Sequence, residues 1–261
     1  MGFRGAIFDV DGVLVDSPHE RAWREALQEL MEHEWSDIRG QTTYSPDRFT
    51  PAIYQAVMAG KPRAAGAQAA LDYFGVPDAA DRAVLYGERK QERVVGLIEE
   101  GKFHAFTDAL RFVLAVKWTG IPLAVASSSK NAGLFLSKIR LDLFCSERGL
   151  PYDFVTDGLT LQKIFDADIS GRDFKQGKPH PEIFLTAAKE LDVPPETCFV
   201  VEDASSGIQA AKAGSMAGLG VARMHDQDLL NEAGADLVVT SLDDVAMNAV
   251  REGRLEKATM I

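Results

Sequence analysis

The sequence is poor in cysteine, since Cys145 and Cys198 are the only two among 261 residues. They lie far apart and in no metal-type spacing, which excludes a disulfide-rich scaffold and a thiolate metal cluster. Cysteine usage of this kind fits a reducing compartment better than secretion. We therefore expect a cytoplasmic protein in which both thiols are inert packing residues.

Long apolar runs are absent as well. The longest, such as residues 121–126, fall far short of the roughly 18 residues of a membrane span. Residues 1–12 contain a single arginine and reach two aspartates, so they lack the apolar centre of a secretory signal. These features predict a chain that neither spans a membrane nor is secreted.

Basic residues are outnumbered, with 28 lysines and arginines against 39 aspartates and glutamates and a formal charge of −11. No stripe of lysine and arginine interrupts this acidity, so phosphate backbones and anionic lipids would be repelled. We expect neither nucleic acid nor a membrane surface as a partner. An anionic small substrate would need locally placed cations or a metal.

The rest of the composition is that of an ordinary globular protein, with 46% hydrophobic and 26% charged residues. Short apolar runs that end in polar residues alternate with helical patterns along most of the chain, which predicts βαβ units. The expected strands are residues 5–8, 122–126, 198–201, 219–222 and 237–239, and the expected helices are residues 105–118, 132–143, 181–191 and 206–213. The predicted class is α/β, with a Rossmann-like parallel sheet core.

Residues 17–101 break this alternation. They have the pattern of four helices, at 19–33, 51–58, 64–74 and 81–100, with a polar, turn-rich stretch at 34–51 and no strand-like run. We predict a helical domain inserted at 17–101 into a catalytic core of residues 1–16 and 102–261. A second irregular stretch, Ser146 to Leu161, is too long for an ordinary loop, and the sequence assigns it no role.

Four clusters of polar residues lie where an apolar run ends or a helix begins. In the first, Phe8 to Ser17, Asp9 and Asp11 project to the same side if strand geometry continues through Val10. Ligands of open α/β sheets bind outside the carboxyl ends of the strands, where these two carboxylates would face one ligand. Alternatively, both aspartates only cap a turn before Gly12.

The other three clusters supply hydroxyls, a lysine and carboxylates. Ser127 follows a strand and would hold phosphate oxygens together with turn N–H groups, unless the cluster only caps a helix through Ser129. Lys178 precedes a helix that begins with proline, where a solvated surface lysine is the alternative. Glu202 and Asp203 end another strand, and adjacent carboxylates repel each other unless a cation or solvent compensates.

In this chain order, from Phe8 to Gly214, the clusters resemble the four motifs of the haloacid dehalogenase superfamily of phosphotransferases. The resemblance implies that Asp9 is the nucleophile that forms an aspartyl phosphate and that Asp11 is the general acid and base. Ser127 would bind the transferring phosphoryl group, and Lys178 would offset its charge and steady Asp9. The ligands implied for Mg²⁺ are Asp9, the backbone carbonyl of Asp11, Glu202 and Asp203.

The helical insert resembles the small cap of the subgroup that contains β-phosphoglucomutase and related sugar-phosphate phosphatases. Local matches are His19 with Trp23, residues 60–63 with Gly66, residues 89–90 and residues 129–131. By this resemblance, Arg63 would hold the second phosphate of a sugar bisphosphate. The substrate-binding residues implied are Arg63, His19, Ser128, Ser129, Lys130 and Asn131. The alternatives are a solvated Arg63, a solvent-facing His19, surface charges at Lys90 and Lys130, and a Trp23 that packs in the core of the insert.

The resemblance implies a Mg²⁺-dependent phosphatase of a small sugar or polyol phosphate, acting as a monomer or homodimer. Phosphate monoester hydrolysis is so slow that catalysis must supply up to about 10²¹-fold, whereas one acid–base group gives about 10²- to 10⁴-fold. The site residues must therefore act together. Two alternatives remain, a β-phosphoglucomutase in which a sugar hydroxyl replaces water, and a catalytically silent sensor of phosphate ligands.

Overall fold

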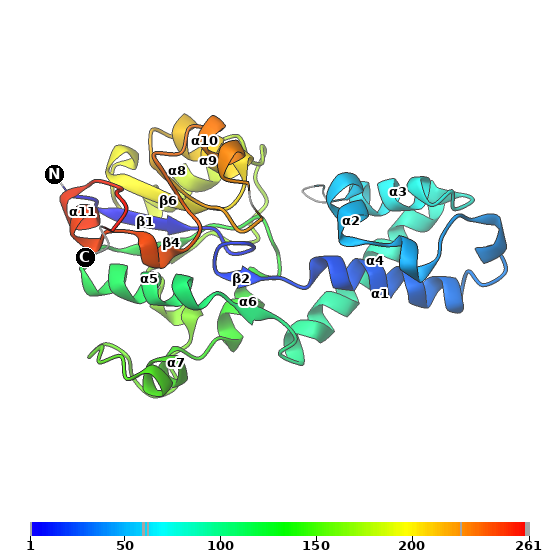
Figure 1. Cartoon of the computed structure of the whole chain (residues 1–261), viewed down its shortest axis with the longest axis horizontal. Helices are drawn as coiled ribbons and strands as arrows, with labels where there is room; N and C mark the ends of the chain where they lie inside the picture. Colours follow the sequence, from blue (N-terminus) through cyan, green and yellow to red (C-terminus); the bar gives the residue numbers. More distant parts are fainter. Residues whose placement is uncertain (1, 59–60, 62, 225, 259–261) are drawn as a thin grey trace. The chain divides into compact units, whose positions relative to one another are not determined.

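The computed structural model describes residues 2–58, 61, 63–224 and 226–258 of the chain. The chain folds as two compact units (Figure 1). We call Met1–Ser17 with His104–Ile261 the core unit, and Pro18–Phe103 the helical insert. The insert therefore interrupts the core unit after its first strands.

A six-stranded sheet organises the core unit, in the order β5-β4-β1-β6-β7-β8. Every neighbouring pair in this sheet is parallel, with Ile7 aligned to Ala124 on one side and to Val200 on the other. The Rossmann-like α/β fold expected from the alternation of strands and helices is confirmed. The strands are β1 (Gly5–Phe8), β4 (Leu123–Val125), β5 (Ala167–Asp168), β6 (Cys198–Glu202), β7 (Ala217–Val221) and β8 (Leu237–Val239).

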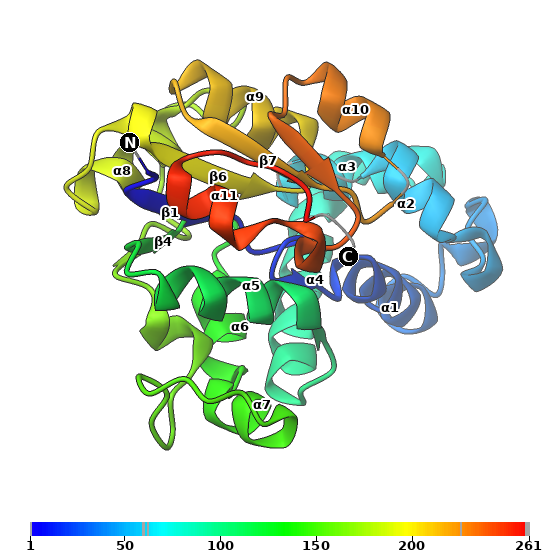
Figure 2. The same ribbon diagram turned by 60° about the vertical axis from the view of Figure 1, so that its left-hand side comes forward.

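Helices cover both faces of this sheet, with α8, α9 and α10 on one face and α5 and α6 on the other (Figure 2). Because side chains alternate along a strand, Ile7 packs with the residues of α8, whereas Phe8 meets Phe112 of α5 edge to face. Full burial of each such side chain contributes about 1.5–3 kcal/mol. The helices are α5 (Thr107–Trp118), α6 (Ala132–Lys138), α7 (Leu141–Arg148), α8 (Glu182–Glu190), α9 (Ser205–Ala213), α10 (Gln227–Glu232) and α11 (Met247–Glu252).

The prediction of one helix over residues 132–143 is wrong, because the chain forms two helices there, α6 and α7, with a break between them. Ile139 and Arg140 are extended there, and the Leu161 N–H donates to the Ile139 carbonyl at 2.8 Å while Arg140 bridges to Thr160. The irregular stretch that follows α7 thus returns to pair with the break. No pattern within residues 132–143 reveals a partner that lies about twenty residues further on.

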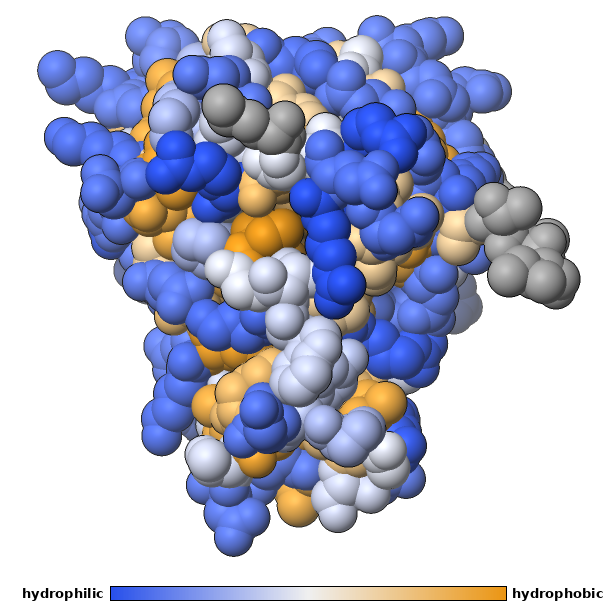
Figure 3. All heavy atoms as spheres, turned by 90° about the vertical axis from the view of Figure 1, so that its left-hand side faces the viewer, coloured by the Kyte–Doolittle hydropathy of each residue, from blue (hydrophilic) through white to orange (hydrophobic). Residues whose placement is uncertain are grey.

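The segment after α7 packs its aromatic side chains against the end of α5. Tyr152 and Phe154 both contact the Trp118 ring, at centroid distances of 5.7 and 6.3 Å. Trp118 and Leu143 nevertheless remain about half exposed. Figure 3 shows hydrophobic side chains at the surface of the lower part of one face, interspersed with hydrophilic ones.

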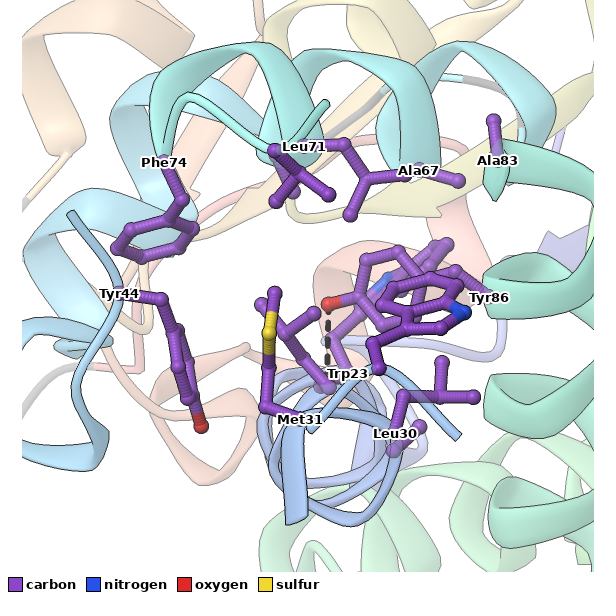
Figure 4. Packing of buried hydrophobic residues seen from close by; sticks show 14 of the residues in the cluster. Trp23, Leu30, Met31, Tyr44, Ala67, Leu71, Phe74, Ala83 and Tyr86 are labelled. Carbon is purple, nitrogen blue, oxygen red and sulfur yellow. Dashed lines mark hydrogen bonds between the residues drawn. The ribbon is translucent and has the colours of Figure 1, made fainter. Parts of the chain in front are cut away.

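The helical insert contains four α-helices and no strand among its described residues. Its core joins Trp23 of α1, Leu71 of α3 and Tyr86 of α4, with the Trp23 and Tyr86 rings edge to face at 4.8 Å (Figure 4). The turn-rich stretch at 34–51 adds three aromatic side chains to this core. They are Trp35, Phe49, which stacks on Phe74, and Tyr44, which meets the same ring edge to face. The helices are α1 (His19–Glu32), α2 (Pro51–Val57), α3 (Arg63–Tyr73) and α4 (Ala79–Glu99).

Short elements complete the chain. The antiparallel strands β2 (Val15–Asp16) and β3 (His104–Ala105) carry the chain from the core unit into the insert and back. Single 3₁₀ turns are η1 (Arg39–Gln41), η2 (Pro46–Arg48), η3 (Leu161–Ile164), η4 (Pro195–Thr197) and η5 (Leu242–Asp244). Across the described ranges, no helix is both long enough and apolar enough to cross a membrane.

Two buried tyrosines of the insert provide a test of its packing. Tyr86 Oη donates a 2.9 Å hydrogen bond to the Trp23 carbonyl, whereas Tyr44 Oη has no hydrogen-bond partner among the described residues. Tyr86→Phe is therefore expected to lower the free energy of unfolding by about 0.5–1.5 kcal/mol, whereas Tyr44→Phe leaves it unchanged or raises it. Urea denaturation followed by tryptophan fluorescence measures both. Equal losses in the two variants would contradict this account of the core.

Candidate active site

The sheet register brings together the ends of β1, β4 and β6. Phe8 aligns with Val125 and Val201, so the residues that follow these three strands meet at one edge. The Asp9 N–H donates to the Val201 carbonyl at 3.1 Å, which continues the ladder one residue past β1. Asp9, Ser127 and Glu202 are all buried at this edge, although the sequence separates them widely.

Lys178, from the turn before α8, joins two of these carboxylates. Its Nζ donates to Asp9 Oδ1 at 2.6 Å and to Glu202 Oε1 at 2.5 Å. Burial alone would lower the pKa of Lys178, but the two carboxylates outweigh burial and raise that pKa above its ordinary value. The ammonium therefore remains charged at neutral pH, and the solvated alternative for Lys178 is wrong. The Nζ of Lys178 also lies over the Phe184 ring, 4.9 Å from its centre.

Glu202 has protein partners on both carboxylate oxygens. While Oε1 accepts from Lys178, Oε2 accepts from the N–H groups of Asp203 and Ala204 at 3.0 Å each. Gly207 of α9 allows this placement, because a Cβ at that position would lie 1.9 Å from the Glu202 carboxylate. The geometry suits Glu202 to holding Lys178 and the turn before α9.

Gly207→Ala is expected to uncouple helix stability from activity. Alanine stabilises a helix relative to glycine by up to about 1 kcal/mol, yet its Cβ must displace the Glu202 carboxylate and with it Lys178. We expect kcat to fall by about 10²-fold, the loss typical of a misplacement near 1 Å. The matched control is Gly96→Ala in α4, where the added Cβ meets no atom within 4 Å. Equal activities of the two variants would contradict the role of Glu202.

Asp203 faces the turn that follows β1. Gly12 there has φ of +79°, and a Cβ on it would lie 1.9 Å from Asp203 Oδ2, so only glycine lets the backbone approach this carboxylate. The turn is closed by its own hydrogen bonds, from the Gly12 N–H to the Val15 carbonyl and from the Leu14 N–H to the Val10 carbonyl, both at 2.8 Å. It presents Asp11, half-buried, beside the end of β1.

Burial in this cluster opposes negative charge. It raises the pKa of Asp9 to about 7, with the Glu202 and Asp11 carboxylates adding to the effect and Lys178 opposing it. Burial also raises the pKa of Asp203 well above its ordinary value, and the carboxylates of Glu202 and Asp9 raise it further. Lys178 alone thus does not neutralise the negative charge of these carboxylates. A bound cation would reduce the repulsion between them.

The oxygen donors of this cluster can be compared with those that Mg²⁺ requires. Within the described ranges, no three His, Cys, Asp or Glu side chains form a closed metal-binding group. Mg²⁺ does not require one, since it keeps several waters and binds through one or two carboxylates together with substrate phosphate. Asp9 and Asp203, next to the backbone of the 10–15 turn, supply such oxygen donors. The donor set therefore fits Mg²⁺.

The hydroxyl cluster after β4 divides into buried and exposed members. Ser127 is 3% exposed, and its Oγ accepts from the Ser129 N–H at 3.2 Å, which leaves its proton for another oxygen. Ser129 Oγ in turn accepts from the N–H of the buried Asn131 at 3.3 Å. Ser128 is exposed, and Lys130 reaches out to Asp173 on the surface at 3.0 Å.

The predicted substrate residues of the insert lie among α1, α3 and α4. Lys90, for which the sequence leaves a surface role open, is instead buried, with Nζ 3.3 Å from His19 Nδ1 and 5.1 Å from the centre of the Trp23 ring. Arg63 begins α3, and its Cγ would lie 3.3 Å from a Cβ at Gly87. Gly60 and Pro62, part of the motif that includes Arg63, lie outside the described residues.

A burial signal for Lys90 does exist in the sequence. It lies four residues after Tyr86, and residues at this spacing share one face of a helix. Tyr86 and Val94, on either side along that face, are both buried. The helical period of α4 therefore places Lys90 on the packed face, although composition alone suggests a solvated charge.

Comparison with known proteins identifies the family of the chain. A family model described as haloacid dehalogenase-like hydrolase matches residues 3–214. The chain is 33% identical to a beta-phosphoglucomutase of Mycobacterium bovis, over 93% of this chain and 91% of that protein. It is 29% identical to the phosphorylated carbohydrates phosphatase of Thermotoga maritima, over 89% and 92%.

Solved structures agree with these relatives. The crystal structure of an archaeal beta-phosphoglucomutase from Pyrococcus sp. strain ST 04 superposes with a TM-score of 0.68. The two chains are 29% identical, and the match covers 94% of this chain and 95% of that one. The similarity thus extends over both the core unit and the helical insert.

Proposed function

Because the chain belongs to the haloacid dehalogenase-like hydrolases and is an enzyme, we propose that it transfers the phosphoryl group of a small sugar or polyol phosphate to water through Asp9. The observation that carries this proposal is the buried bridge of Lys178 between Asp9 and Glu202. It holds one oxygen of the Asp9 carboxylate and leaves the other for attack on phosphorus.

Asp9 and Asp11 divide the chemistry between them. In the first step Asp9 Oδ2 bonds to phosphorus, the bond from phosphorus to the sugar oxygen breaks, and the leaving oxygen takes a proton from Asp11. In the second step water bonds to phosphorus and gives a proton to Asp11, the bond between phosphorus and Asp9 Oδ2 breaks, and phosphate leaves. The second step thus restores both the Asp9 carboxylate and the protonated Asp11, so the cycle is balanced.

The remaining residues manage charge and orientation. Lys178 offsets the negative charge of Asp9 and of the phosphoryl oxygens, and the Ser127 hydroxyl donates to one of those oxygens. Asp9, the carbonyl of Asp11 and Asp203 would hold Mg²⁺, which when bound supplies positive charge against the phosphoryl dianion. Glu202, which the resemblance implies as a further Mg²⁺ ligand, is assigned instead to keeping Lys178 in place, because both of its carboxylate oxygens already accept from protein donors.

By the family resemblance, basic residues of the insert would bind the rest of the substrate. Arg63 and Lys90 are the basic residues that we assign to this task, with His19 beside Lys90. A planar guanidinium suits phosphate oxygens, and a buried ammonium favours an anionic or hydroxyl-rich partner. The names of the relatives, a beta-phosphoglucomutase and a phosphatase of phosphorylated carbohydrates, support a sugar phosphate.

A second candidate is β-phosphoglucomutase activity. Arg63 and Lys90 favour it, because two cations in the insert would suit a second phosphate, and the Mycobacterium bovis relative carries that name. The two functions share the first step and differ in whether water or a sugar hydroxyl receives the phosphoryl group from Asp9.

One assay tests and separates the two functions. The protein is mixed with Mg²⁺, β-glucose 1-phosphate and a trace of glucose 1,6-bisphosphate, and glucose 6-phosphate and free phosphate are followed together. Free phosphate without isomerised sugar supports the phosphatase, and glucose 6-phosphate in large excess supports the mutase. If neither product appears here or with a broad panel of sugar and polyol phosphates, both functions are wrong.

Metal removal is expected to stop the reaction. Without a cation, the Asp9 and Asp203 carboxylates and the phosphoryl dianion repel one another, so dialysis against EDTA should leave less than about 1% of the activity. Adding back Mg²⁺ should restore it, whereas adding Na⁺ at equal ionic strength should not. Full activity after EDTA dialysis would contradict the assignment of Mg²⁺.

A further inference from the structure

An arginine that none of the four motifs contains lies next to the 10–15 turn. Arg223 follows β7 by two residues, and its side chain is largely buried, with 15% exposed. Its guanidinium forms a two-pronged ion pair with Asp108 of α5, with Nη1 to Oδ2 at 2.9 Å and Nη2 to Oδ1 at 3.2 Å. The guanidinium carbon Cζ lies over the Phe106 ring, 4.0 Å from its centre.

Asp108 is itself held rigidly. Its Oδ2 accepts from the Leu242 N–H at 2.8 Å and from the Ser241 hydroxyl at 3.3 Å. Although burial raises the pKa of Asp108, the hydrogen bonds from Arg223 and Leu242 hold it below its ordinary value. Asp108 therefore stays ionised at neutral pH and is a fixed anchor for the guanidinium.

The same guanidinium reaches the backbone of the turn that carries Asp11. Nε donates to the Gly12 carbonyl and Nη2 to the Val13 carbonyl, both at 3.4 Å. The Asp203 carboxylate also lies against Gly12. Both Arg223 and Asp203 thus contact the turn at Gly12, one residue after Asp11.

These contacts also join the two connections to the insert. Gly12 and Val13 lie in the turn that leads into β2, and Phe106 and Asp108 follow β3. The Phe106 N–H donates to the Leu14 carbonyl at 3.0 Å, so the outgoing and returning chains already touch where Arg223 binds both. A lysine ammonium at this position could not form the two-pronged ion pair, the ring contact and the two carbonyl contacts together.

We infer that Arg223 is a positioning residue for Asp11, fixing the 10–15 turn so that the Asp11 carboxyl meets the leaving oxygen. The inference rests on the proposed role of Asp11 as general acid. Loss of a positioned acid slows the departure of a poor leaving group more than that of a good one, since only the poor one needs the proton. A general loss of folded structure would slow both alike.

The experiment measures phosphorylation of Asp9 in single turnovers with a sugar phosphate and with p-nitrophenyl phosphate, whose leaving group needs little protonation. Arg223→Met is expected to lower the rate of Asp9 phosphorylation by about 10- to 10²-fold with the sugar phosphate and by less than about 3-fold with p-nitrophenyl phosphate. Arg223→Lys keeps the positive charge beside Asp108 but loses the two-pronged guanidinium. The rate of Asp9 phosphorylation should therefore fall by similar factors in this variant. Arg223→Lys also provides a second variant if the methionine variant does not fold.

Arg111→Met is the matched control. Arg111 forms another two-pronged pair from α5, with Asp243, but this pair is exposed and contacts no residue of the 10–15 turn among the hydrogen bonds of the described chain. Its rates should stay within about 2-fold of wild type for both substrates. Equal losses with the two substrates in Arg223→Lys, or a loss in Arg111→Met as large as in Arg223→Met, would overturn the inference. Absence of Asp9 phosphorylation in the wild-type protein would instead overturn the proposed function.

Discussion

Asp9→Asn is expected to abolish turnover, with kcat falling by roughly 10⁶-fold, the scale seen when a hydrolase loses its nucleophile. The amide is too weak a nucleophile to form an acyl phosphate. Its carbonyl can still accept from Lys178, so the fold should persist. Phosphate release from a panel of sugar phosphates measures the loss.

The control for this variant is Asp157→Asn, which removes an exposed carboxylate far along the chain, in the segment after α7. It should keep kcat within about 2-fold of wild type, as expected for a surface change. A circular dichroism spectrum identical to wild type would show that Asp9→Asn is folded. Residual activity above about 1% in that folded variant would exclude Asp9 as the nucleophile.

Asp11→Asn is expected to lower kcat by about 10²- to 10⁴-fold, the usual contribution of a general acid and base. Its effect on Mg²⁺ affinity should be small, because the proposed contact of Asp11 with the metal is through its backbone carbonyl. Mg²⁺ titration of the purified protein by calorimetry separates the two effects. A collapse of Mg²⁺ affinity would mean that the Asp11 side chain is itself a ligand.

Asp203→Asn serves as the comparison for that titration. Its carboxylate lies against Gly12 beside the same turn, and it is the side chain that we assign to the cation. We expect Mg²⁺ affinity to fall at least tenfold in this variant while Asp11→Asn keeps it. If Asp11→Asn lost Mg²⁺ affinity while Asp203→Asn kept it, the Asp11 side chain and not that of Asp203 would be the Mg²⁺ ligand.

The α/β class could be predicted because four strands of the sheet, β1, β4, β6 and β7, are short runs of mostly buried residues, and the helices between them show a clear period. Gly5–Phe8 and Leu237–Val239 have the expected bounds, and the other predicted strands differ by one or two residues at one or both ends. β5 has only two residues, too few for any period to appear. The break between α6 and α7 depends on pairing with Thr160 and Leu161, which is a tertiary effect.

The site could be predicted in part for a similar reason. Asp9 and Lys178 stand 169 residues apart and become neighbours because α8 packs on the sheet beside β1, yet each follows a recognisable local signal. The engagement of both Glu202 oxygens and the close approach of Gly12 to Asp203 depend on side-chain placement that spacing does not encode. Arg223 lies in no motif, and its role emerges only from the contacts of its guanidinium.

The most direct test of the central claim is to find the phosphoryl group on the enzyme. The wild-type protein is mixed with Mg²⁺ and excess sugar phosphate, quenched in acid within one turnover, digested and analysed by mass spectrometry. We predict one phosphoryl group on the peptide that contains Asp9, labile to hydroxylamine as an acyl phosphate should be, and absent from Asp9→Asn. Product formation without any phosphorylated intermediate, or a phosphoryl group on Ser127 instead, would contradict transfer through Asp9.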